Sequence, residues 1–226
     1  MTANRLRALS AVLWDMDGVL ADSGDAHFAA WRGLLAERGT AVSRRQFDDT
    51  FGMANDLIVA EWFGEALTSD ERRALGLRKE ERFRGLLAGN VRLLPGVTAW
   101  LERFQGWRWR QAVASSGEMA NVAAVVAHLG IGNYFDALLS GAFLPRSKPD
   151  PTVFLHAAAA LGSAPHECLV IEDGVPGVEA ARRAGMLCIA VTTTHPAERL
   201  ASADLVVESL DDLTPEMLNA LCQSRG

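Results

Sequence analysis

The sequence has 226 residues, of which 49% are hydrophobic and 22% are charged, a composition typical of a folded globular protein. Its formal net charge of -6 argues against nucleic acid or an anionic membrane surface as a partner. No apolar stretch is long enough to span a bilayer, and the run that follows Arg5 and Arg7 is too short for a signal peptide. The three cysteines lack C-x-x-C spacing, which favours free thiols. We therefore expect a cytoplasmic protein that binds neither membrane nor nucleic acid. We also expect a monomer, although the sequence leaves the oligomeric state open.

The first predicted strand ends at a pair of carboxylates. The apolar run Ala11–Trp14 indicates a buried strand of a parallel sheet, and Asp15 and Asp17 follow it directly. Ligands of open α/β sheets gather at the carboxyl ends of strands, so both carboxylates are expected at the mouth of a site. Gly18 lets the chain turn there without a Cβ clash. Taken alone, Asp-x-Asp-Gly is more typical of a simple turn.

The residues after this strand are predicted to be helical. Apolar residues recur at helical spacing over residues 25–38, 56–63 and 70–87, and Gly76 is expected to break the third stretch. The whole segment is far longer than the usual strand-to-helix loop of about 2–6 residues. We therefore expect residues 23–94 to form a helical domain of their own. Residues 90–94 are the expected return hinge, and residues 1–22 and 95–226 would form the core.

Strands and helices alternate through the remainder of the chain. The expected strands are 111–115, 137–139, 168–171, 187–191 and 205–207. The expected helices are 97–104, 120–129, 151–161, 175–184 and a last one that begins at Thr214 and Pro215. This alternation predicts a parallel sheet covered by helices on both faces. The predicted fold class is α/β, with a Rossmann-like parallel sheet core and an inserted α-helical domain.

Polar side chains follow four of the predicted strands. After the first strand they are Asp15 and Asp17, after the second Ser115 and Ser116, after the third Ser147 and Lys148, and after the fourth Glu172 and Asp173. Carboxyl ends of parallel strands meet at one edge of a sheet, so these side chains are expected in one crevice. A carboxylate nucleophile, hydroxyl and lysine donors for phosphate oxygens, and a second acidic pair for a hard cation suit phosphoryl transfer.

These segments resemble the four ordered motifs of the haloacid dehalogenase-like hydrolase superfamily. The matching segments are Asp15-x-Asp17-Gly-Val, Val113-Ala-Ser115-Ser116, Ser147-Lys148-Pro-Asp-Pro and Ile171-Glu172-Asp173-Gly-x-x-Gly177. The resemblance covers nearly the whole chain, and the inserted helices resemble the cap of the β-phosphoglucomutase and sugar-phosphate phosphatase branch. It implies a Mg²⁺-dependent phosphatase that hydrolyses a small phosphorylated metabolite, a sugar or polyol phosphate, through an aspartyl-phosphate. A β-phosphoglucomutase-like phosphohexomutase is the alternative.

The resemblance implies a catalytic role for four residues. Asp15 would attack phosphorus, and Asp17 would protonate the leaving alcohol and later activate water. Ser115 and Lys148 would hold the phosphoryl oxygens. Pre-placed donors and cations of this kind stabilise the charge of the transferring group. For Lys148 alone, a solvated loop lysine would be the simpler interpretation.

The expected cofactor is Mg²⁺. The resemblance implies that the Asp15 carboxylate, the main-chain carbonyl of Asp17 and Asp173 bind the ion, with Glu172 binding directly or through water. A dense acidic cluster without a cation would favour protonation of at least one carboxylate. A bound divalent cation removes that penalty.

Further substrate contacts are expected from Ser116 in the core and from the cap. His27 matches a substrate-facing histidine of the mutase-like relatives, although an ordinary partly buried histidine is an equal alternative. Gly52 belongs to a segment that resembles the cap substrate loop. Lys79 aligns with a cap lysine that reaches the substrate, although it could equally be a surface residue. Asn55 stands where β-phosphoglucomutase has an arginine that grips a second phosphate, and this departure argues for a hydrolase.

Two other classes of function fit the sequence less well. Dehalogenation of a halo-acid would use the same nucleophile but would need neither Asp17 as acid and base nor Asp173 as a metal ligand. A catalytically idle binding module is disfavoured because no motif residue is missing.

Overall fold

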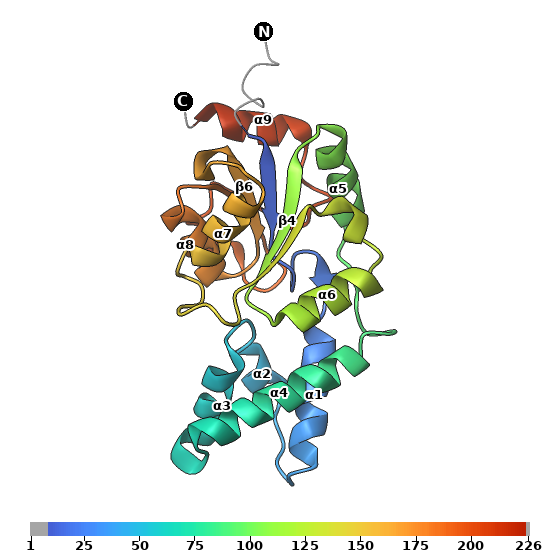
Figure 1. Cartoon of the computed structure of the whole chain (residues 1–226), viewed down its shortest axis with the longest axis vertical. Helices are drawn as coiled ribbons and strands as arrows, with labels where there is room; N and C mark the ends of the chain where they lie inside the picture. The colour runs from blue at the N-terminus through green and yellow to red at the C-terminus, as the bar shows by residue number, and fades with distance from the viewer. Residues whose placement is uncertain (1–8, 225–226) are drawn as a thin grey trace.

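The structure is a computed structural model that describes residues 9–224. Arg5 and Arg7, and with them the first eight residues of the expected core, lie outside the described residues. Figure 1 shows a sheet with helices on both faces in one part of the molecule and the helices α1 to α4 gathered below it. The path from the first strand leads down into these helices and returns to the sheet.

The sheet has six strands in the order β5-β4-β1-β6-β7-β8, and all neighbouring strands run parallel. The strands are β1 (Ala11–Trp14), β4 (Arg110–Ser115), β5 (Ala137–Ser140), β6 (Cys168–Glu172), β7 (Leu187–Val191) and β8 (Leu205–Val207). In register, Trp14 at the end of β1 lies between Val113 of β4 and Ile171 of β6. The residues that follow β1, β4 and β6 are therefore neighbours. The predicted Rossmann-like parallel sheet is confirmed.

Side chains of β1 alternate between the two faces of the sheet, as a strand requires. Val12 and Trp14 belong to the apolar cluster on the face that α5, α6 and α9 cover, whereas Ala11 and Leu13 belong to the cluster under α7 and α8. These helices are α5 (Val97–Gly106), α6 (Met119–His128), α7 (Thr152–Ala160), α8 (Val175–Arg183) and α9 (Pro215–Ser224). Burial on both faces explains the unbroken apolar run that predicted β1.

Two short strands join the sheet to the lower helices. β2 (Ala21–Asp22) pairs antiparallel with β3 (Arg92–Leu93), so the outgoing and returning chains run side by side. The main-chain N–H of Leu94 also donates to the carbonyl of Leu20 at 3.2 Å. β3 falls inside the expected return hinge at residues 90–94. The pairing itself was not expected, because two-residue strands carry no periodicity that a sequence could display.

The lower helices have an apolar core of their own. They are α1 (Gly24–Ala36), α2 (Arg44–Asp48), α3 (Asn55–Phe63) and α4 (Ser69–Gly85). The buried side chains between them include Trp31, Leu34, Phe47, Ile58 and Leu75. We call these four helices the cap. These side chains bury apolar surface between the cap helices themselves.

The expected break of a cap helix at Gly76 is wrong. α4 continues from Ser69 through Gly76 to Gly85. A Cβ atom added at Gly76 would lie 3.0 Å from the Cβ of Asn55 in α3. The glycine therefore lets α3 approach α4 closely, and packing outweighs its weak helix propensity.

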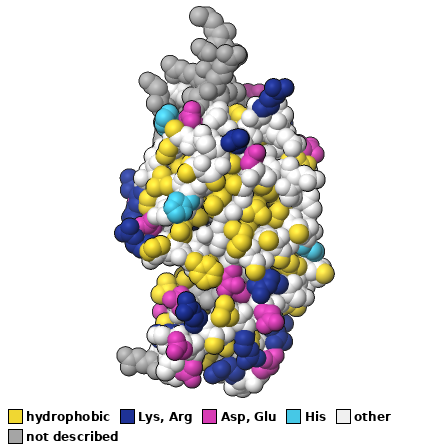
Figure 2. All heavy atoms as spheres, viewed as in Figure 1, with side chains coloured by type: hydrophobic (Ala, Val, Ile, Leu, Met, Phe, Trp, Pro, Cys, Tyr) yellow, Lys and Arg dark blue, Asp and Glu magenta, His cyan; other side chains and the backbone are white. Residues whose placement is uncertain are grey.

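The cap surface is rich in charges of both signs. Figure 2 shows lysine or arginine side chains interspersed with aspartate and glutamate over the end of the molecule that the cap forms. Arg44 bonds Asp25 and Asp48, and both Arg78 and Arg82 bond Glu37. Exposed pairs of this kind contribute little to stability, about 0–1 kcal/mol each.

Among the described residues, no helix is both long and apolar enough to cross a membrane.

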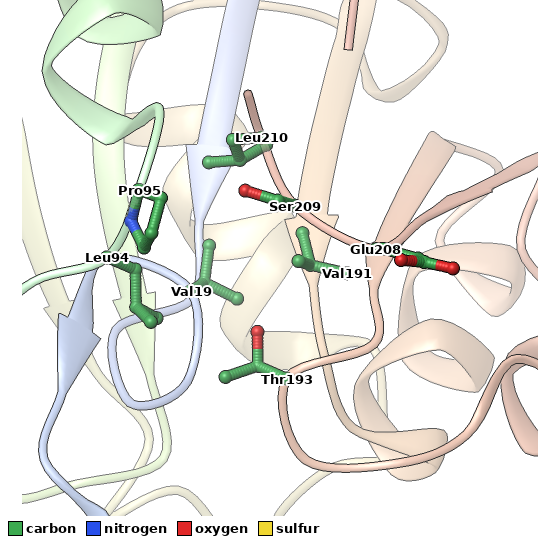
Figure 3. A pocket seen from close by; sticks show the side chains of 8 residues that line it. All are labelled: Val19, Leu94, Pro95, Val191, Thr193, Glu208, Ser209 and Leu210. Atoms are coloured by element: carbon green, nitrogen blue, oxygen red, sulfur yellow. The ribbon is translucent and has the colours of Figure 1, made fainter. Parts of the chain in front are cut away.

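A small crevice of about 160 Å³ lies beside the hinge (Figure 3). It is lined by Val19 after β1, by Leu94 and Pro95 on the returning chain, by Val191 and Thr193 after β7, and by Glu208, Ser209 and Leu210 after β8. Its walls therefore include both chains that connect the sheet to the cap. The crevice contains none of the motif carboxylates.

Candidate active site

Lys148 joins the residues after β1 and β6. Its ammonium nitrogen donates to Oδ1 of Asp15 at 2.6 Å and to Oε1 of Glu172 at 2.7 Å. It also donates to the carbonyl of Ala114 in β4 at 3.2 Å. The three side chains are buried, with between 3% and 12% of each side chain exposed. Lys148 is therefore a buried cation at the meeting point of three strands and not a solvated loop lysine.

Asp15 and Asp173 have raised pKa values in this arrangement. Burial, and then repulsion from Glu172, outweighs the attraction of Lys148 and raises the pKa of Asp15 from 3.8 to about 7. Burial, together with repulsion from Glu172 and Asp15, raises the pKa of Asp173 well above its usual value. Burial alone would lower the pKa of Lys148, but the charges of Asp15 and Glu172 raise it. The cluster has more negative charge than one ammonium group neutralises.

An excess of buried carboxylate oxygens fits a hard divalent cation, which prefers oxygen ligands. Within residues 9–224, no three acidic, histidine or cysteine side chains converge as a ready-made metal-binding group. The Mg²⁺ ligands expected from the sequence are the side chains of Asp15 and Asp173 and the main-chain carbonyl of Asp17, with Glu172 binding directly or through water. Oε2 of Glu172 already accepts the main-chain N–H groups of Asp173 and Gly174, and Oε1 accepts from Lys148. Glu172 is thus well placed to organise the loop and to hold Lys148.

Two glycines make room for these carboxylates. Gly18 has a φ of +83°, and a Cβ added there would lie 2.0 Å from Oδ2 of Asp173. A Cβ added at Gly177 would lie 1.7 Å from Oε1 of Glu172. Both acidic side chains therefore occupy space that only a glycine leaves open.

Ser115 ends β4 beside the cluster. It is buried, and its hydroxyl oxygen accepts the main-chain N–H of Gly117 at 3.0 Å. Its neighbour Ala114 contributes the carbonyl that Lys148 contacts. Ser116 is exposed in the same loop. The loop is fixed further by Ser140 of β5, whose hydroxyl donates to the carbonyl of Gly117 at 2.6 Å.

Asp17 turns toward the cap. Its Oδ1 accepts the hydroxyl of Ser23 at 2.5 Å and lies 3.3 Å from Nε2 of His27. Burial alone would raise its pKa, but the hydrogen bonds from His27 and Ser23, together with the charge of Lys79, lower it. In this conformation Asp17 is held as a carboxylate.

His27 connects Asp17 to Lys79. The ammonium group of Lys79 lies 2.7 Å from Nδ1 of His27 and can only donate, so Nδ1 accepts and Nε2 carries the proton that faces Asp17. The imidazole stacks on Phe83, with ring centroids 3.8 Å apart and planes inclined by 9°. The chain has two lysines, Lys79 and Lys148, and both are buried in these networks.

Glu80 gathers the remaining cap contacts. Its Oε1 accepts from Asn55 at 2.6 Å and from Lys79 at 2.9 Å, and its Oε2 accepts from Asn121 of α6 at 2.5 Å. Asn121 also accepts from Arg84 of α4 at 2.8 Å. Burial alone would raise the pKa of Glu80, but the charge and hydrogen bond of Lys79 and the hydrogen bond of Asn55 lower it. These bonds tie the cap to the core through α4 and α6.

The structure thus groups the expected residues in two linked sets. Asp15, Ser115, Lys148, Glu172 and Asp173 lie in the core. His27, Asn55 and Lys79 lie in the cap, and Asp17 contacts His27 from the core side. Gly52 is exposed in the turn before α3, with a φ of +86°, and no atom lies within 4 Å of a Cβ added there, so no contact links it to either set.

Comparison with known proteins identifies the family. Residues 9–185 match the family described as haloacid dehalogenase-like hydrolase. The chain belongs to this family. Members of similar length include β-phosphoglucomutase of Bacillus subtilis, 31% identical over 93% of this chain and 94% of that one, and hexitol phosphatase B of Escherichia coli, 32% identical over 94% and 97%. A crystal structure of β-phosphoglucomutase from Clostridium difficile superposes with a TM-score of 0.85 at 25% identity, covering 96% of this chain and 98% of that one.

Membership confirms the predicted family, its fold and the prediction of a hydrolase of phosphoric monoesters. Within this haloacid dehalogenase-like hydrolase, some residues of the site were not expected from the sequence. They are Glu80 and Asn121 at the cap, and Thr194, whose hydroxyl donates to Oδ2 of Asp173.

Of these residues, Thr194 left a usable signal. It follows the strand Leu187–Val191. Polar residues that follow parallel strands were expected at the site, and Thr194 meets that criterion. Glu80 and Asn121 left none, because they bond each other across 41 positions of the sequence.

Proposed function

We propose that the protein is a Mg²⁺-dependent phosphatase that hydrolyses a small phosphorylated sugar or polyol through an aspartyl-phosphate. The observation that carries the proposal is the contact of Lys148 with Asp15, at 2.6 Å, where β1, β4 and β6 end. A buried carboxylate beside a fixed cation is suited to meet a phosphoryl group and to balance its charge. The relatives named as phosphatases of similar length support the same class of substrate.

In the proposed first step, a carboxylate oxygen of Asp15 attacks phosphorus and the bond from phosphorus to the substrate oxygen breaks. Lys148 and Ser115 hold the phosphoryl oxygens during transfer. Asp15, Asp173 and the carbonyl of Asp17 would hold Mg²⁺, which would supply positive charge that keeps the carboxylates ionised and offsets their repulsion of the phosphate. The raised pKa of Asp15, about 7 without a cation, supports this need.

Asp17 supplies and removes the protons. It protonates the leaving alcohol in the first step. In the second step it takes a proton from the water that attacks phosphorus, which releases inorganic phosphate and regenerates Asp15. Its present bonds to Ser23 and His27 stabilise the carboxylate form, which suits the base role. Asp17 must exchange these bonds for the substrate oxygen before it can donate a proton.

The cap favours hydrolysis over phosphohexomutase activity. A mutase must bind a second phosphate at the cap, which calls for an unneutralised, preferably forked, cation. Asn55 is neutral and bonds Glu80, and Glu80 also bonds the ammonium group of Lys79. The likeness to β-phosphoglucomutase keeps mutase activity as the second candidate. We further propose that the enzyme acts in the cytoplasm as a monomer.

A screen of phosphorylated metabolites tests the proposal. Purified protein is incubated with Mg²⁺ and with sugar, polyol, glycolate and nucleoside monophosphates, and inorganic phosphate is measured. We expect release from a sugar or polyol phosphate that stops with EDTA and is abolished in Asp15→Asn. Release that continues in Asp15→Asn at the wild-type rate would refute the aspartyl-phosphate mechanism.

A further inference from the structure

Thr194 contacts a carboxylate on which the proposed metal site depends. It lies in the loop after β7, and its hydroxyl donates to Oδ2 of Asp173. Its two neighbours have other roles. The main-chain N–H of Thr192 donates to the carbonyl of Val207 at 3.0 Å, and Thr193 lines the crevice beside the hinge (Figure 3). Thr194 is therefore the member of this threonine run that faces the acidic cluster.

A second, independent feature confines the same oxygen. A Cβ added at Gly18 would lie 2.0 Å from Oδ2 of Asp173 and 2.9 Å from the hydroxyl oxygen of Thr194. The main chain of the loop after β1 and the side chain of Thr194 thus enclose Oδ2 from two sides. The hydroxyl proton occupies one of its lone pairs. Oδ2 is left poorly available to a further ligand, so a cation would approach Asp173 through Oδ1.

We propose that Thr194 sets the cation preference of the site by restricting Asp173 to coordination through one oxygen. Mg²⁺ requires near-octahedral geometry at about 2.0–2.1 Å and accepts single carboxylate oxygens. Ca²⁺ takes about 6–8 oxygens at longer distances and often binds both oxygens of one carboxylate. Thr194 therefore favours Mg²⁺ over Ca²⁺. This inference rests on the proposed function, because it takes the Mg²⁺ site as given.

Direct titration with each cation tests the inference without reference to turnover. Calorimetry measures the Kd of Mg²⁺ and of Ca²⁺ for the wild-type protein, Thr194→Val, Thr194→Ser and Thr193→Val. Valine keeps the shape of threonine and removes the hydroxyl, whereas serine keeps the hydroxyl. Thr193→Val makes the same chemical change one residue away, in the hinge crevice. Cation-dependent shifts of the thermal unfolding midpoint provide a second readout.

We expect Thr194→Val to lower the ratio of the Ca²⁺ Kd to the Mg²⁺ Kd by about tenfold, the scale on which partners of metal ligands act. Thr194→Ser and Thr193→Val should keep the wild-type ratio. An unchanged ratio in Thr194→Val, or an equal loss of both affinities, would overturn the inference. So would a Thr194→Ser variant that matches Thr194→Val.

If Thr194→Val does not fold, Thr194→Ala provides the same comparison with a smaller side chain. The inference and the proposed function fail in different ways. A wild-type protein that binds neither cation would refute the proposed metal site and the inference with it. A wild-type protein that binds Mg²⁺, combined with an unaltered ratio in the variants, would refute the role of Thr194 alone.

Discussion

The side-chain amide of Asn55 donates to Oε1 of Glu80 at 2.6 Å and is therefore held between α3 and α4. The same carboxylate binds Lys79 and, through Asn121, the core. Asn55 and Lys79 of the cap thus share one buried carboxylate acceptor. Under the proposed function, this pairing leaves no unneutralised cation among these residues for a second phosphate.

The first prediction is that the protein releases phosphate and does not isomerise sugar phosphates. β-Glucose 1-phosphate is offered with a trace of the 1,6-bisphosphate, and both glucose 6-phosphate and free phosphate are followed. Loss of a charged pair at the distal phosphate is expected to weaken its binding by about 2–5 kcal/mol. Efficient formation of glucose 6-phosphate with little free phosphate would contradict the prediction. Asn55→Arg provides a comparison in which binding of the bisphosphate should improve.

The second prediction concerns Asp17. Replacement by asparagine should lower turnover of alkyl phosphates by about 10²–10⁴-fold, because the leaving alcohol is then not protonated. With p-nitrophenyl phosphate, whose leaving group needs no proton, the first step should survive and the second should not. Rapid mixing should show a burst of nitrophenol followed by slow turnover. Equal losses with both substrates, without a burst, would argue against the acid and base roles of Asp17.

The third prediction is a dependence of stability on pH in the metal-free protein. The pKa of Asp15 is about 7 in the folded protein, against 3.8 for the free group. Between about pH 4 and pH 7 the folded state therefore holds a proton that the unfolded state has released, so the free energy of unfolding should fall as pH rises. Asp173, with a pKa raised in the same direction, adds to this slope.

Urea unfolding in EDTA across this pH range measures the slope. Mg²⁺ should flatten it, because the ion favours the ionised carboxylates. Asp15→Asn should flatten it without metal, because the amide does not titrate. A metal-free wild-type protein whose stability rises from pH 4 to pH 7 would show that Asp15 is not the buried acid described above.

The fourth prediction compares two glycines in helices. Gly177→Ala in α8 should destabilise the protein by about 1–3 kcal/mol, because the new Cβ collides with the Glu172 carboxylate that holds Lys148. Gly106→Ala at the end of α5 meets no atom within 4 Å and should be neutral or slightly stabilising. Thermal unfolding and phosphate release are measured for both. A Gly177→Ala variant as stable and active as Gly106→Ala would disprove the close packing of Glu172.

Much of the core could be predicted because its signals are local. Continuous apolar runs such as Ala11–Trp14 and Leu187–Val191 mark strands that are buried on both faces, and their bounds agree with the structure. The five-residue helix α2 was missed because so short a segment shows no helical period. The helix break predicted at Gly76 was wrong because this glycine lets Asn55 pack closely against α4, and Asn55 is distant in the sequence.

The site also contains residues that local sequence signals predict and residues that depend on distant contacts. Asp15, Lys148, Glu172 and Asp173 follow strands, and the order of a parallel sheet brings such residues together without further information. The environment of Lys79 could not be predicted, because its partner His27 lies 52 positions away in the sequence and reaches it only through folding of the cap. A helical lysine next to a glutamate is usually a surface residue, and in this chain both side chains are less than 10% exposed.

Both lysines of the chain are buried, and every other basic side chain of its 22 lysine and arginine residues is an arginine. Amine-directed reagents such as acylating esters therefore find no exposed ammonium side chain in the closed molecule. Acylation of Lys79 or Lys148 requires the surrounding contacts to open first. The rate at which each lysine is modified can be followed by peptide mass spectrometry. The rate for Lys79 measures how often the contacts of the cap open, and the rate for Lys148 measures how often the carboxylate cluster opens.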